Sequence, residues 1–304
     1  MRRLLASELL RFRSRRLVVV LLGASLGGSL VGATIAAVQS TRPTDAVRAA
    51  ALARAEQGFR ECMNTDYGYE EFDGSQEEIC RENAGNPAFF MPSHLALAEL
   101  PDILEGISSL TSVLGLVIGA SVVASSWQTG TIGTILTWEP RRLRWLSARM
   151  FVVGLGVFAI TMVIVAFLSS ALAIAAALRG STLLGDGWWT DVVATSLRVA
   201  AIAGVAALIG GAVAAVGRHT AAALGVVFVY TAVLEGLVRA FRPLWSPWLL
   251  GDNIVSFVAW RTTEFGVVSG SYVLSPGRAA FVIVGYTALA LALAFTFVRI
   301  RDVQ

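Results

Sequence analysis

The chain has 304 residues, of which 56% are hydrophobic and only 15% are charged, and its formal net charge is +3. A soluble domain of this length has about a quarter of its residues charged, so the composition excludes an ordinary soluble protein. All 24 basic residues are arginine, and the absence of lysine excludes a P-loop ATPase and a Schiff-base enzyme, because both need that amine.

Residues 1–16 predict an amphipathic helix. Leu5, Leu9 and Phe12 recur at a helical spacing, and arginines occupy the other faces. Such a helix is suited to lie in the plane of the inner leaflet. The alternative is a basic flank that only sets the topology.

Residues 17–304 predict one transmembrane domain with six spans. Each apolar run approaches or exceeds the roughly 20 residues that a bilayer requires. The first run is longer than the apolar core of a signal peptide, so we expect it to be retained. The six runs cover residues 17–38, 107–126, 150–178, 192–216, 220–241 and 279–298.

The arginines orient these spans. They gather in the N-terminal segment, in 127–148, and after the fourth and sixth spans. By the positive-inside rule, these segments and both termini are cytoplasmic, whereas 39–106 and 242–278 lie outside. The bias toward arginine, alanine, glycine and valine points to a GC-rich bacterium, so we expect a multi-pass protein of the bacterial plasma membrane.

The outside segment 39–106 is far longer than a connector, and we expect a small helical cap. Helix-forming residues follow Pro43, and a second helical stretch follows Gly74. The segment holds the only cysteines of the chain, Cys62 and Cys80. Two cysteines in an exported segment predict a disulfide, with two unpaired thiols as the alternative.

The cytoplasmic segment 127–148 is longer than a change of direction requires. It begins with a short amphipathic stretch, is then interrupted by proline, and continues with arginines. We interpret it as a coupling helix and a docking surface, with an arginine-rich loop that serves topology alone as the alternative. The candidate docking residues are Gly130, Thr131, Trp138, Glu139, Pro140, Arg141, Arg142 and Arg144.

The outside segment 242–278 is apolar but interrupted by Pro243, Pro247 and Gly251. It predicts a pair of short re-entrant or interfacial helices, with tryptophans at the level of the lipid headgroups. Such interruptions exclude a seventh full span.

Three polar residues are candidates for a translocation path. Glu235 lies in the fifth span, where an acidic residue is a functional candidate, although Arg239 one turn later offers a structural ion pair instead. Asp252 and Asn253 either line an exit path or cap a short helix.

Glycines also recur at a spacing of four, and they let helix backbones approach closely, either within the chain or between two chains. The pairs are Gly23/Gly27, Gly28/Gly32 and Gly115/Gly119.

The segment from Gly130 to Arg149 resembles the loop between the second and third spans of ABC-2 type transporter permeases. Gly-Thr, a leucine-containing stretch, and Pro followed by arginines, as in TWEPRR, are similar to many actinobacterial members. One departure is that Ser126, Trp127 and Gln128 stand where members often have an acidic residue. The N-terminal helix, the six spans and the interrupted segment before the last span agree with the same plan.

This resemblance implies an all-α membrane protein of the type V exporter kind. The chain would be the permease subunit of an ATP-binding cassette transporter, paired with a second copy or a homologue. A separate cytoplasmic ATPase subunit would bind ATP and magnesium, so we expect no catalytic residue, cofactor, metal or nucleic acid here. The cargo would be an amphipathic small molecule, a peptide or a lipid. The alternatives are a membrane sensor or scaffold that transports nothing, and an ion-coupled secondary transporter.

Overall fold

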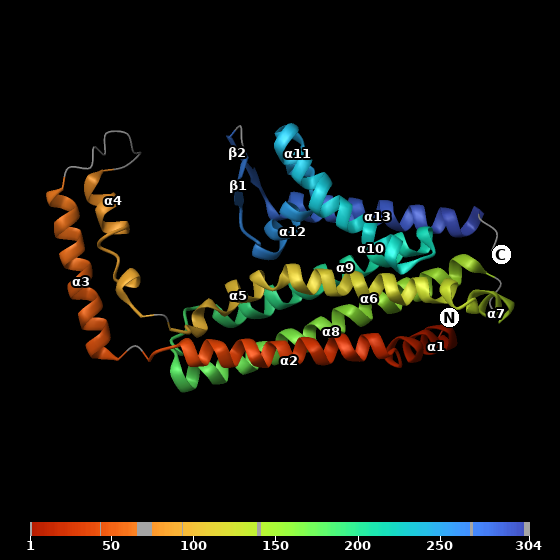
Figure 1. Ribbon diagram of the computed structural model, residues 1–304, viewed down its shortest axis with the longest axis horizontal. Coiled ribbons are helices and arrows are strands. Elements are labelled where there is room, and N and C mark those ends of the chain that lie inside the picture. Colours follow the sequence, from red (N-terminus) through yellow and green to blue (C-terminus); the bar gives the residue numbers. More distant parts are fainter. Residues whose placement is uncertain are drawn as a thin grey trace. The chain divides into compact units, whose positions relative to one another are not determined.

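The chain folds mainly into α-helices (Figure 1). The computed structural model describes residues 2–42, 44–65, 75–92, 94–138, 141–267 and 270–300, and for Trp138 it describes the backbone alone. The structure is 83% helical and divides into two compact units. The larger unit comprises Met1–Gly28, Pro101–Phe167 and Gly187–Gln304, and the smaller unit comprises Ser29–Leu100 and Leu168–Asp186.

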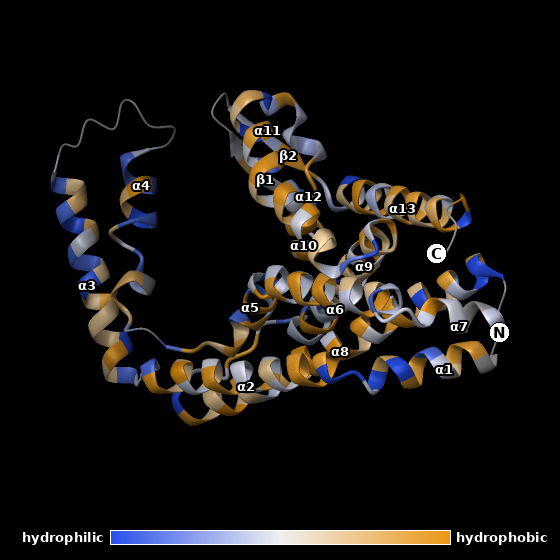
Figure 2. Ribbon diagram, turned by 45° about the vertical axis from the view of Figure 1, so that its right-hand side comes forward, coloured by the Kyte–Doolittle hydropathy of each residue, from blue (hydrophilic) through white to orange (hydrophobic). Residues whose placement is uncertain are grey.

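Among the described residues, six helices are long and apolar enough to cross a membrane, one for each predicted span, and they fit a multi-pass membrane protein. Hydrophobic residues follow these helices, whereas hydrophilic residues gather on α1 (Arg2–Arg13) and α3 (Asp45–Asn64) (Figure 2). The helices are α2 (Arg16–Gln39), α6 (Ser108–Gln128), α8 (Arg142–Arg179), α9 (Trp188–Gly217), the composite Thr220–Phe241 and α13 (Pro276–Ile300). The composite span consists of α10 (Thr220–Phe228), the π-helical stretch η4 (Val229–Leu234) and α11 (Glu235–Phe241).

The centre of the larger unit is the contact between α6 and α9. A Cβ atom on Gly115 would collide with the backbone of Ala203, and one on Gly119 with the backbone of Ala207. These glycines therefore let two parallel helices approach closely within the chain. By contrast, no described atom lies within 4 Å of a Cβ placed on Gly23 or on its three neighbours at this spacing in α2.

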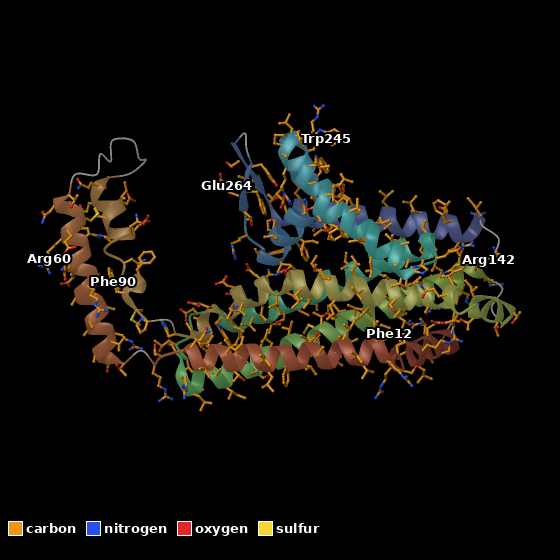
Figure 3. All side chains as sticks on the ribbon, viewed as in Figure 1. Phe12, Arg60, Phe90, Arg142, Trp245 and Glu264 are labelled. Atoms are coloured by element: carbon orange, nitrogen blue, oxygen red, sulfur yellow. A yellow bond between two sulfur atoms is a disulfide. The ribbon has the colours of Figure 1, made fainter. Side chains whose placement is uncertain are left out.

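The N-terminal helix α1 packs onto the same unit through Phe12. This side chain is 5% exposed and belongs to a buried cluster with Val18, Val152 and Val153 (Figure 3). Gly156 of α8 makes room for it, because a Cβ atom there would lie 2.7 Å from the Phe12 ring. The predicted amphipathic helix is therefore present, and its apolar face is covered by protein at Phe12.

The smaller unit contains the predicted helical cap. α3 begins after Thr44, whose side chain accepts a hydrogen bond from the Val47 backbone; Pro43 lies outside the described residues. The disulfide between Cys62 and Cys80 is present, as predicted, and joins α3 to α4 (Gln76–Glu82). The 3₁₀ turns η2 (Pro87–Phe90) and η3 (Leu97–Glu99) and the short helix α5 (Leu100–Gly106) lead toward α6.

Between the last two spans the prediction of two short helices is only partly correct. The 3₁₀ helix η5 (Pro243–Trp248) and α12 (Leu250–Ala259) are present. The antiparallel strands β1 (Thr263–Val267) and β2 (Gly270–Leu274) follow, so the fold is not entirely α-helical. Stacking between Phe265 and Tyr272 favours a hairpin here, as does the enrichment in β-branched and aromatic residues.

Candidate functional site

The candidate docking residues lie at one end of the larger unit, which we call the arginine end. Gly130 has a φ of +67°, a left-handed conformation that glycine adopts at little cost, and it separates α6 from α7 (Thr131–Trp138). Ile132 of α7 is 5% exposed and packs into a core cluster. The short helix expected from the sequence is therefore present and anchored. α1 and α7 lie at the same end of the larger unit (Figures 1 and 2).

After α7, the candidate docking residues continue into the beginning of the third span. Glu139, Pro140 and the side chain of Trp138 lie outside what the structure describes. Arg141 is exposed, and its carbonyl accepts hydrogen bonds from the Arg144 and Trp145 amides, so it caps the N-terminus of α8. The first turn of α8 contains Arg142 and Arg144. These residues therefore belong to a helix and not to a flexible loop.

The arginines at the start of α8 lie at the end of the helix where its dipole disfavours positive charge. The N-terminus of a helix carries a partial positive charge, which disfavours each nearby cation by about 0.3–1 kcal/mol at low ionic strength. The first turn of α8 contains no acidic residue. Arginine side chains bind acidic protein surfaces and anionic lipid headgroups alike.

A buried ion pair joins α1 to α8 at the arginine end. The side chains of Glu8 and Arg149 are each 3% exposed, and Arg149 Nη1 lies 3.8 Å from Glu8 Oε2. Arg149 also donates to the Val122 carbonyl oxygen at 2.5 Å and lies 5.2 Å from the ring centroid of Trp145. Nothing in the sequence predicts this pair, although Glu8 is the only acidic residue among the N-terminal arginines.

Arg15 extends the connection from α1 to α6. It donates to the Ser121 carbonyl oxygen at 3.0 Å and to the Ser125 hydroxyl. Burial lowers the pKa of Arg15, and the nearby Glu8 carboxylate acts in the opposite direction. Hydrogen bonds and one ion pair thus fasten the N-terminal segment to two spans, and a force applied to α1 would reach both.

Trp127 makes a cation–π contact at the arginine end. Its ring centroid lies 4.9 Å from the guanidinium of Arg218, which follows α9. A cation over an aromatic face is attracted by the ring quadrupole.

Two of the three candidates for a translocation path, Glu235 and Asp252, come together around Arg239 in a second cluster. Arg239 Nη2 lies 3.2 Å from Glu235 Oε2 and 2.8 Å from Asp252 Oδ1. Tyr272 donates to Asp252 Oδ2 at 2.5 Å, and burial first, then this bond, raise the pKa of Tyr272 above its usual value. The Gly251 amide donates to Glu235 Oε1 at 3.0 Å. These contacts join the fifth span to α12 and the hairpin.

Asn253 has a local role in the same region. It is fully buried and donates to the carbonyl oxygens of Pro247 and Leu249, at 3.1 and 2.6 Å. It therefore joins the first turn of α12 to the backbone at the end of η5. The sequence indicated the Glu235–Arg239 pair but carried no signal for the contacts with Asp252 and Tyr272.

A cavity of about 770 Å³ lies within the larger unit, between α6 and α9 on one side and α10, η4, α12 and α13 on the other. Its wall is almost wholly apolar, and the few polar side chains include Ser112, Tyr230 and Tyr286. Tyr230 donates to the Tyr286 hydroxyl at 3.2 Å, and Tyr286 donates to the Trp248 carbonyl oxygen at 3.2 Å. This volume is in the usual range of small-molecule sites, about 300–1,000 Å³.

The described residues contain no group of three or more His, Cys, Asp or Glu side chains arranged to hold a metal ion. No protein-family model and no curated protein sequence matches this chain. The function of the chain is therefore inferred from its own geometry.

Proposed function

We propose that this chain is the membrane-spanning permease subunit of an ATP-binding cassette transporter. It would export an amphipathic small molecule, a peptide or a lipid across a bacterial plasma membrane, using ATP hydrolysed by a separate cytoplasmic subunit. The observation that carries the proposal is the arginine end, where α1, α7 and the first turn of α8 form a structured surface connected to the spans.

This surface meets the requirements for docking an ATPase. Arg141 is exposed at the capped start of α8, where its side chain is available to an acidic surface of a partner. Trp138 ends α7 immediately before them. Tryptophan and arginine are both enriched among residues that dominate the binding energy of protein interfaces.

The connection from this surface to the spans supports the coupling role. Ile132 fixes α7 in the core, and Glu8 of α1 pairs with Arg149 of α8. Displacement of either short helix would therefore require movement of α6 or α8, because buried contacts transmit force with little compliance. In this proposal, ATP-driven movement of the partner enters through both short helices.

The proposed transport path lies between two permease copies, or between this chain and a homologue. Glu235, Asp252 and Asn253 were candidates for this path. Their contacts favour a structural role: Glu235 and Asp252 share Arg239, which joins α12 to the fifth span, and Asn253 bonds the backbone just before α12.

The experiment is co-expression with the ATP-binding cassette ATPase encoded nearest to the gene, followed by purification and transport measurement in vesicles. The wild-type chain is expected to retain the ATPase and to support ATP-dependent export. The double variant Trp138→Ala/Arg141→Glu should reach the membrane at normal abundance, retain much less ATPase and lose export.

The matched control is Arg299→Glu, which reverses one exposed charge at the end of α13, away from α7 in the sequence. It should leave copurification and export near wild type. If the double variant retains its ATPase and its export at wild-type levels, the arginine end is not the coupling surface. If no ATPase copurifies with the wild-type chain, the assignment as a permease subunit is wrong.

A further inference from the structure

The α9 wall of the cavity follows one face of that helix and leads to a single arginine. Ile202, Ile209 and Val216 of α9 line the cavity. These residues recur at intervals of seven, so they lie on one face, and Arg198 is on the same face one turn before Ile202. The cavity therefore has an apolar interior and a cation just beyond one end.

Arg198 lies at the level where a membrane surface is expected. α6 and α9 run parallel, with Gly115 beside Ala203 and Gly119 beside Ala207. Each residue of α9 in these pairs follows its neighbour in α6 by the same number of positions. That number places Arg198 level with Leu110, in the first turn of α6. From Arg198 to Gly217, α9 rises about 30 Å, which is the thickness of a bilayer hydrocarbon core. Counted back from Gly217 by this thickness, Arg198 lies near one boundary of the hydrocarbon core and the cavity lies within the core.

The surroundings of Arg198 leave binding capacity for an anion. Its Nη2 donates to Thr195 Oγ1 at 2.8 Å, and its guanidinium lies 5.6 Å from the ring centroid of Trp260. Its Nε is buried and, within the described part of the chain, has no hydrogen-bond partner. A buried donor without a partner is unfavourable, and the guanidinium as a whole, which is only partly buried, is a group that pairs well with phosphate oxygens.

Two acidic residues near this end must be considered. Glu105 is paired with Arg261, whose Nη1 lies 2.9 Å from Glu105 Oε1. Asp191 is exposed in the first turn of α9, where the helix dipole favours a negative charge. Neither carboxylate makes an ion pair with Arg198 among the described contacts, but both act on its charge over a longer distance.

We propose that the cavity and Arg198 together bind an anionic glycerophospholipid, with an acyl chain along the α9 wall and the phosphate at Arg198. The rise from Ile202 to Arg198 is about 6 Å, which leaves space for the glycerol and ester groups between chain and phosphate. The wall from Ile202 to Gly217 is about 22 Å long, which exceeds the roughly 15 Å occupied by one leaflet. This binding requires no ATPase, so it is independent of the proposed permease function.

The experiment measures lipid binding to the full chain, purified in neutral detergent, by native mass spectrometry. Dioleoyl-phosphatidylglycerol and dioleoyl-phosphatidylcholine have the same acyl chains and differ in headgroup charge. The wild-type chain should bind the anionic lipid about tenfold more tightly, as one charge-assisted hydrogen bond provides. Arg198→Gln should abolish this preference, Arg198→Lys should restore part of it, and the control Arg48→Gln in α3 should leave it unchanged.

Filling the cavity tests the acyl-chain part of the site. Ala206→Trp and Val213→Trp each place a large ring in the wall, and each should weaken binding of both lipids. Glycerol 3-phosphate alone should not compete, because it has no chain. Equal affinity of the wild-type chain for the two lipids, or retention of the preference by Arg198→Gln, would overturn the proposal. A last outcome would also overturn it. If Ala206→Trp converted a dimer of the chain into monomers and left lipid binding unchanged, a second copy of the chain, and not a lipid, would be the occupant of the cavity.

Discussion

Replacing Glu8 with glutamine preserves the volume of the side chain and removes the charge that faces Arg149. Both side chains are 3% exposed, and their closest charged atoms lie 3.8 Å apart. Removing one partner of a buried pair leaves the other charge uncompensated, which typically destabilises a protein by about 3–5 kcal/mol. Arg149 keeps its bond to the Val122 carbonyl oxygen, so we expect a loss near the lower limit, about 3 kcal/mol.

The effects of substitutions at Glu8 and Arg149 on stability should be strongly coupled. In the double variant Glu8→Leu/Arg149→Met, apolar side chains replace both charges, and no charge remains buried alone. Such replacements are often neutral or stabilising, so the double variant should be more stable than Glu8→Gln. The outer partner of Glu8 provides a control, because Arg11 is 52% exposed and Arg11→Gln should change stability by about 1 kcal/mol or less.

The assay is reversible unfolding of the purified chain in mixed micelles, with the free energy of unfolding extrapolated to zero denaturing detergent. A buried, unpaired Arg149 would not be destabilising if Glu8→Gln lost no more stability than Arg11→Gln. The coupling would be refuted if the double variant lost the sum of the stabilities lost by Glu8→Leu and by Arg149→Met, because independent effects would mean that the charges do not interact.

Three further predictions follow from the packing and the chain topology. Gly119→Ala should destabilise the α6–α9 contact by about 1–3 kcal/mol in the same assay, whereas Gly23→Ala, with no described atom near it, should be neutral or slightly stabilising. Replacing Cys62 and Cys80 with serine should lower the free energy of unfolding by about 3 kcal/mol, as expected for a loop of this length, and peptide mapping without reductant should recover the linked peptide from the wild-type chain. In that serine background, a cysteine at position 137 should react with an impermeant reagent only from the cytoplasmic side; labelling from outside would contradict the topology.

Much of the fold could be predicted from the sequence because a membrane span is a local property. An apolar run of about 20 residues must cross or avoid a bilayer whatever it packs against, and all six predicted spans are present as helices. The short helix after Gly130 and the disulfide were predictable for similar reasons. The first depends on a local break in the chain, and the second on only two cysteines in one segment. The hairpin was not predicted, because the prolines and tryptophans that precede it indicate short interrupted helices and carry no information on the strands that follow.

The partners of the buried charges were decided by the tertiary structure alone. Glu8 and Arg149 are far apart in the sequence, and nothing near either residue indicates the other, because their contact depends on how α1 packs against α8. The bridge from Arg239 to Asp252 depends in the same way on where α12 lies. Likewise, the regular spacing of Ile202, Ile209 and Val216 marks one face of α9, but only the placement of the other helices makes that face the wall of a cavity. Hydropathy and charge patterns sum over neighbouring residues, whereas a buried ion pair or a cavity is formed by residues that only folding brings together.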